Sequence, residues 1–129
     1  MNNDEIRVLL VDDEKMICDC VSAYLEDEGF TVRSAFSGEE GLEIIAAFCP
    51  AVCISDLNLP GMGGEEFIVK AHTLYPPTGF MLHTGMLYSL SDRLRAIGMT
   101  ADDVLLKPVH DLSKLVKKIR LTAASRRES

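Results

Sequence analysis

The chain has 129 residues, 47% hydrophobic and 26% charged, which is typical of one globular domain in solution. Its 20 acidic and 13 basic side chains give a formal net charge of −7, which argues against this domain binding nucleic acid directly. Its apolar runs are too short to cross a bilayer and no signal segment opens the sequence, so we expect a cytoplasmic domain with no membrane contact.

Short apolar runs alternate with longer amphipathic stretches along the chain. The short runs are rich in branched side chains, which is typical of buried parallel strands, and the long ones have helical spacing. The expected strands are 6–11, 31–35, 51–55, 80–83 and 104–106. The expected helices are 14–28, 37–48, 65–74, 91–97, with 88–90 as an alternative extension, and 111–123.

This alternation predicts an α/β fold in which a five-stranded parallel sheet is covered by helices on both faces. No linker or low-complexity stretch divides the sequence. We therefore expect a single domain over 1–129, with a core at about 6–123 and a polar, frayed tail at 124–129 that could begin a linker.

The cysteine pattern favours reduced thiols over a structural zinc site. Cys18, Cys20, Cys49 and Cys53 form no CxxC pair and have no histidine at a ligand spacing. Cys18 and Cys20 would point to different faces of one helix, and Cys53 lies in an apolar run that we expect to be buried. Reduced thiols of this kind are the norm in cytosolic proteins.

Polar residues fall at the expected carboxyl ends of four strands, which is where open parallel sheets bind ligands. They are Asp12, Asp13, Asp56, Thr84 and Lys107. Three carboxylates at one place repel each other, and a hard divalent cation with oxygen ligands resolves that conflict. Mg²⁺ is suitable because it takes carboxylates, water and a phosphate group.

The other two side chains suit a phosphoryl group carried by a carboxylate. Lys107 offers a positive charge and Thr84 a hydroxyl group, with room beside it at Gly85. An aspartate can attack phosphorus to give an acyl phosphate, and the metal and the lysine then neutralise its charge.

Four motifs, spread over about 6–123, resemble those of one known family. They are Leu10-Val11-Asp12-Asp13-Glu14, Asp56-Leu57-Asn58-Leu59-Pro60-Gly61-Met62-Gly63-Gly64, His83-Thr84-Gly85 and Leu106-Lys107-Pro108. In this order and spacing they resemble the response-regulator receiver domain of two-component signalling. The resemblance implies a flavodoxin-like (βα)5 three-layer sandwich with strand order 2-1-3-4-5.

The resemblance also implies a role for each matched residue. Asp56 would be the phosphoacceptor, Thr84 and Lys107 would contact the phosphoryl group, and the Lys107–Pro108 bond would be cis. The magnesium ligands would be Asp12, Asp13, Asp56 and the backbone carbonyl of Asn58.

The function implied is that of a bacterial signalling domain rather than an enzyme. It would take a phosphoryl group from a histidine kinase or phosphotransfer protein and catalyse only its own Mg²⁺-dependent phosphotransfer and dephosphorylation. Phosphorylation would switch the binding of a downstream output domain or protein, with a homodimer as one option.

Three positions depart from the family's pattern. Val104 replaces the usual switch aromatic, Val109 replaces a phenylalanine, and Thr100 stands where a glycine is common. The phosphorylation chemistry does not depend on these residues, but the usual coupling between Thr84 and an aromatic does. A protein-binding module that keeps the fold without phosphorylation is therefore the alternative.

Two further readings receive less support. A phosphohydrolase of the aspartyl-phosphate type would need an Asp-x-Asp motif after the first strand, whereas Asp12 and Asp13 are adjacent. His83 is expected as a half-buried strand residue rather than an acid or base, and His72 and His110 as surface residues.

Overall fold

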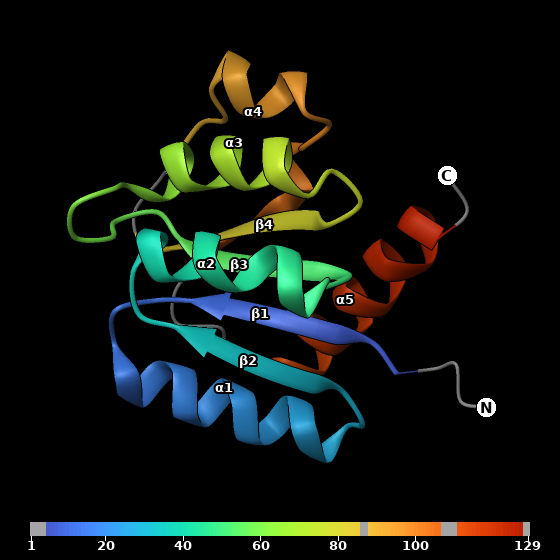
Figure 1. The fold of residues 1–129 in the computed structure, drawn as a ribbon. Coiled ribbons are helices and arrows are strands. Elements are labelled where there is room, and N and C mark those ends of the chain that lie inside the picture. The colour runs from blue at the N-terminus through green and yellow to red at the C-terminus, as the bar shows by residue number, and fades with distance from the viewer. Residues whose placement is uncertain (1–4, 86–87, 107–110, 128–129) are drawn as a thin grey trace.

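A five-stranded parallel sheet forms the centre of the molecule (Figure 1). The computed structural model describes residues 5–85, 88–106 and 111–127. The strands are β1 (Arg7–Val11), β2 (Thr31–Ala35), β3 (Val52–Asp56), β4 (Gly79–Thr84) and β5 (Val104–Leu106). Their order is β2-β1-β3-β4-β5, which confirms the flavodoxin-like order expected from the sequence.

Helices cover both faces of this sheet and make the fold a three-layer sandwich (Figure 1). The α2–α3–α4 layer consists of α2 (Gly38–Phe48), α3 (Gly64–Leu74) and α4 (Asp92–Ala96). The α1–α5 layer consists of α1 (Lys15–Asp27) and α5 (Leu112–Arg127). A short 3-10 helix, η1 (Ala101–Asp103), leads into β5.

Side chains of each central strand point alternately into the two layers. In β1, Leu9 and Val11 face the α2–α3–α4 layer, whereas Val8 and Leu10 face the α1–α5 layer. All four are buried, and burying such a side chain contributes about 1.5–3 kcal/mol. Burial on both faces explains why the central strands are mainly apolar runs in the sequence, whereas the edge strand β2 contains Arg33 and Ser34.

The core of the α1–α5 layer joins the two ends of the described chain. Its buried residues include Ile6, Val8 and Leu10 near the start and Leu115, Val116, Ile119 and Ala123 in α5. Arg120 adds a polar link, since its Nη2 donates to the carbonyl of Glu28 at 3.2 Å. Its guanidinium carbon also lies 4.8 Å from the ring centroid of Phe30, within range of a cation–π contact.

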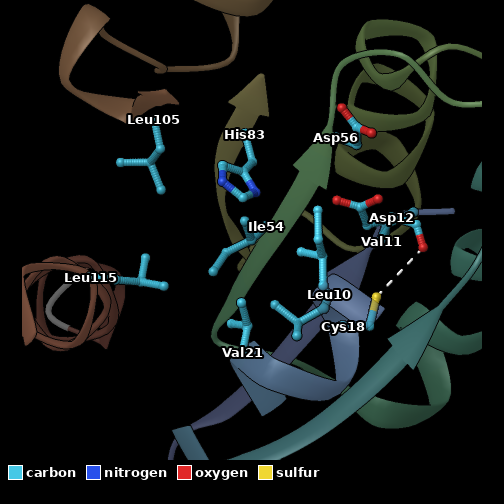
Figure 2. A pocket seen from close by; sticks show the side chains of 11 residues that line it. Leu10, Val11, Asp12, Cys18, Val21, Ile54, Asp56, His83, Leu105 and Leu115 are labelled. Carbon is cyan, nitrogen blue, oxygen red and sulfur yellow. Dashed lines mark hydrogen bonds between the residues drawn. The ribbon is translucent and has the colours of Figure 1, made fainter. Parts of the chain in front are cut away.

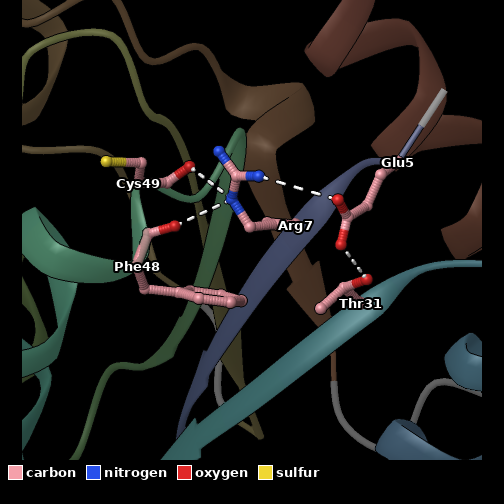
Figure 3. A network of polar contacts seen from close by, with 5 residues as sticks. All are labelled: Glu5, Arg7, Thr31, Phe48 and Cys49. Atoms are coloured by element: carbon pink, nitrogen blue, oxygen red, sulfur yellow. Dashed lines mark hydrogen bonds and ion pairs between the residues drawn. The ribbon is translucent and has the colours of Figure 1, made fainter. Parts of the chain in front are cut away.

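Arg7 holds the end of α2 at the sheet edge away from the predicted site (Figure 3). Its Nε donates to the carbonyls of Phe48 at 2.8 Å and Cys49 at 3.3 Å, which lack partners within the helix. The positive guanidinium also suits the negative end of the helix dipole. Glu5 pairs with Arg7 at 3.8 Å and accepts a hydrogen bond from Thr31 at 2.6 Å.

The last two helices differ from the prediction. Helix α4 is confined to Asp92–Ala96, so it excludes residues 88–90 and ends before Ile97. Helix α5 runs to Arg127, so the predicted frayed tail is helical through that residue. Alanine and arginine have high helix propensity, which favours the longer α5.

The cysteines lie as expected, and all four belong to the described residues. Cys18 and Cys53 are buried, Cys20 is exposed on the other side of α1, and none of the four forms a disulfide. Burial raises the pKa of the Cys53 thiol far above its ordinary value.

Within the described helices, none combines the length and the apolar character that crossing a membrane requires.

Candidate functional site

Three carboxylates meet at the carboxyl-end edge of the sheet. Asp12 and Asp13 directly follow β1, and Asp56 is the last residue of the neighbouring strand β3. One carboxylate oxygen from each lies within 4.8 Å of the others. Asp12 and Asp56 are buried, with 4% and 6% exposure, whereas Asp13 is exposed. We call these three residues the acidic cluster.

Main-chain N–H groups orient the two buried carboxylates. Asp12 Oδ1 accepts a hydrogen bond from the N–H of Glu14 at 2.9 Å, just before α1 begins. Asp56 Oδ1 accepts one from the N–H of Asn58 at 3.2 Å. Each aspartate thus forms a local turn with the residue two positions later, which aspartate favours.

The acidic cluster is a suitable donor set for a hard divalent cation. It offers several carboxylate oxygens within one coordination sphere, and cations such as Mg²⁺ bind through oxygen ligands. Two of the three carboxylates are buried, where a neighbouring positive charge is worth most. The cluster can therefore hold a metal ion.

Thr84 ends β4 beside the acidic cluster. It is fully buried, and the register pairs Asp56 with His83, which places Thr84 one residue beyond Asp56 along the sheet. Asn58 lies in the loop after β3, where its side chain is exposed. Lys107, Pro108 and His110 lie outside the described residues, so the predicted phosphoryl contact and cis bond stay predictions.

A cavity of about 20 Å³ lies beneath the acidic cluster, between the sheet and the α1–α5 layer (Figure 2). Its walls are mainly apolar, with Asp12, Asp56 and His83 at one end. This volume suits one water molecule, so any larger ligand must bind at the open edge above it. His83 is buried, at 8% exposure, rather than half-buried as predicted, because it points into this cavity.

Sequence reasoning missed the reason for glycine at position 64. A Cβ on Gly64 would overlap the carbonyl oxygen of Asp56 and lie 2.8 Å from Cα of Leu57. The N–H of Gly64 also donates to the carbonyl of Leu57 at 2.9 Å. The first turn of α3 therefore rests directly on the backbone of Asp56. The Gly63-Gly64 pair is the only feature of the sequence here that could indicate this close contact, and on its own it predicts no more than a loop.

Comparison with known proteins assigns the family. The sequence model described as "Response regulator receiver domain" matches residues 8–120. The chain is 32% identical over 105 residues to the cell cycle response regulator CtrA of Brucella ovis, an alignment covering 81% of this chain and 45% of that protein. The chain thus spans about half the length of the curated relatives it matches.

Solved structures agree with this assignment. A CheY-like receiver domain protein from Methanospirillum hungatei superposes with a TM-score of 0.83 at 31% identity, covering 96% of this chain and 98% of that one. The chemotaxis protein CheY4 of Vibrio cholerae gives a TM-score of 0.78 at 31% identity, with 92% and 98% covered. With the family match over residues 8–120 and the sheet order, these likenesses place the chain in the family of response-regulator receiver domains.

Proposed function

We propose that this domain accepts a phosphoryl group on Asp56 from a histidine kinase or phosphotransfer protein. The observation that carries the proposal is the acidic cluster, in which buried Asp56 lies beside two further carboxylates at the ligand-binding edge of the sheet. Mg²⁺ would be held there by Asp12, Asp13, Asp56 and the backbone carbonyl of Asn58. When bound, it neutralises charge on the phosphoryl oxygens.

The chain's own residues supply the rest of the chemistry. A carboxylate oxygen of Asp56 forms the new bond to phosphorus while the bond from phosphorus to the donor's imidazole nitrogen breaks. The imidazole keeps the electron pair of that bond and takes up a proton. The Asn58 N–H fixes the Asp56 carboxylate, while the Thr84 hydroxyl and the Lys107 ammonium group would contact the phosphoryl oxygens.

The output follows from the added charge. A phosphoryl group brings about −1.5 to −2 charges to the sheet edge, which changes the preferred position of nearby segments. The affinity of the domain for an output domain or protein would then change, and homodimerisation is one way in which this could occur. We place this signalling in the cytoplasm of a bacterial cell. Its catalysis would be limited to its own phosphotransfer and dephosphorylation. Residues 1–129 would form a single domain, and their last residues would begin a linker if an output domain follows.

The alternative is a binding module that does not depend on phosphorylation. Val104 favours it, because this half-buried residue packs against the core where receivers usually carry an aromatic. The acidic cluster argues for the first function, since a passive binding module has no need of three carboxylates together.

Beryllofluoride tests the proposal, because on an aspartate it stands in for the acyl phosphate and does not hydrolyse. We expect amide NMR signals near Asp13, Asp56 and Thr84 to shift when Mg²⁺ and beryllofluoride are added. The Asp56→Asn variant should show no beryllofluoride-dependent shifts. A folded wild-type sample without shifts would refute phosphorylation at Asp56 and leave the binding module.

Neutralising Asp13 should have opposite effects on two quantities: the stability of the metal-free domain should rise, and the stabilisation by Mg²⁺ should fall. In EDTA, Asp13→Asn removes one of three repelling charges, so the free energy of unfolding should rise by about 1 kcal/mol. Saturating Mg²⁺ should stabilise the variant less than the wild type, since one ligand is lost. Urea unfolding in both buffers measures this, with Asp19→Asn on the exposed face of α1 as control. If Mg²⁺ raised the free energy of unfolding by the same amount in the variant and in the wild type, Asp13 would be excluded as a ligand.

A further inference from the structure

One carboxylate at the start of α3 holds two residues of the segment that follows β4. Tyr88 Oη donates a hydrogen bond to Glu65 Oε1 at 2.9 Å. Arg93, in α4, donates from Nη1 to the other oxygen, Glu65 Oε2, at 3.4 Å. The side chain of Glu65 is 27% exposed, and its bond from Tyr88 is partly buried, whereas its contact with Arg93 is exposed to water.

Glu65 is closely connected to the backbone of Asp56. It follows Gly64, whose Cα lies so close to the Asp56 carbonyl that a Cβ cannot fit between them. The Gly64 N–H also bonds to the Leu57 carbonyl at 2.9 Å. Because this turn is packed backbone against backbone, Glu65 is held at a fixed place relative to Asp56.

Tyr88 is connected to Thr84 along the chain. Thr84 is buried at the end of β4, and Tyr88 comes four residues later with its ring against the core of the α2–α3–α4 layer. Burial first, and then the hydrogen bond and charge of Glu65, raise the pKa of Tyr88 above its ordinary value. A hydrogen bond to an ionised carboxylate is about twice as strong as a neutral one.

The position of α4 depends on such contacts. The helix has five residues, and so short a helix has little stability of its own. Its N-cap is Ser91, whose Oγ accepts from the N–H of Leu94 at 3.3 Å. The bonds from Tyr88 and Arg93 to Glu65 therefore help decide where α4 lies against α3.

We infer that the Tyr88–Glu65 hydrogen bond is a latch that couples Asp56 to the position of α4, in place of an aromatic residue at position 104. The inference rests on the proposed function. A phosphoryl group on Asp56 that binds the Thr84 hydroxyl draws the end of β4 toward the site. Tyr88 is then pulled away from Glu65, which stays with α3, and the latch opens.

Opening the latch costs free energy, so the latch opposes phosphorylation. Tyr88→Phe keeps the ring and removes only the hydroxyl group, so it should raise the affinity for beryllofluoride in Mg²⁺ by about three- to tenfold, the usual effect of one hydrogen bond. Tyr75→Phe makes the same chemical change at the opposite end of α3 and should leave the affinity unchanged. Titration calorimetry on the three proteins measures the affinities.

Fluorine NMR observes the latch directly. The sequence has three tyrosines, so 3-fluorotyrosine labelling gives three signals, which Tyr→Phe variants assign. Beryllofluoride should shift the Tyr88 signal and leave those of Tyr24 and Tyr75 in place. In Asp56→Asn no signal should move.

The outcomes separate this inference from the proposed function. Amide shifts at Asp56 with an unmoved Tyr88 signal and unchanged Tyr88→Phe affinity would overturn the latch alone. A lower affinity of Tyr88→Phe would also overturn it, because the bond would then belong to the phosphorylated state. No shift anywhere in folded protein would overturn both.

Discussion

An Asp56→Asn variant is expected to keep the fold and to take up no phosphoryl group from a small phosphodonor. The asparagine oxygen can still accept the N–H of Asn58, so the loop after β3 keeps its local hydrogen bond. The amide lacks the nucleophilic carboxylate that the transfer needs, and the loss should therefore be complete. Mass spectrometry of intact protein incubated with Mg²⁺ and phosphoramidate measures the uptake directly.

The matched control for this experiment is Asp19→Asn, which removes one negative charge from the exposed face of α1. It should take up one phosphoryl group per chain, like the wild type. If Asp56→Asn still gained a phosphoryl group, the acceptor would be another side chain, and Asp13 and Asp12 would be the next residues to replace.

Replacement of Gly64 by alanine is expected to destabilise the domain by about 2–3 kcal/mol, because the new methyl group would overlap backbone atoms. Neither the Asp56 carbonyl nor the Leu57 Cα can rotate away, so the first turn of α3 must shift. Alanine's better helix propensity recovers only part of this cost. Urea unfolding measures the change.

Gly63→Ser provides the control one residue earlier. Gly63 is the N-cap of α3 with φ −69°, and the nearest atom to an added Cβ is the Leu57 carbonyl oxygen at 3.9 Å. Serine is a preferred N-cap, so its effect should lie within about 0.5 kcal/mol of zero or be stabilising. Equal stabilities of the two variants would show that α3 does not rest on Asp56 in solution.

The strands were predictable because their chemistry is local. Apart from β2, each strand is a short apolar run, and the polar residues Asp12, Asp56 and Thr84 mark where three of the runs stop. Since carboxyl ends of parallel strands share one edge, the meeting of the carboxylates also followed from the sequence. The strand order depended on the family resemblance, because periodicity does not say which strands are neighbours.

Other features depend on contacts between distant residues. Tyr88 and Glu65 are 23 positions apart, and nothing in the spacing of either segment indicates their hydrogen bond. The close packing of Gly64 on Asp56 was equally hidden, because a glycine pair indicates a loop whatever lies against it. The alternative extension of helix α4 over 88–90 is wrong, because local apolar spacing does not reveal which residues tertiary contacts will hold in a helix.

The buried cores of the two helical layers have all their residues synthesised at different times. The buried core of the α2–α3–α4 layer comes from residues between Leu9 and Met99, so all of it is made before α5. Helix α1 is among the first elements made, yet its partner α5 is the last element described. The part of the α1 surface that packs on α5 therefore stays uncovered until α5 has been made, whereas the part that packs on β1 and β2 can be covered earlier.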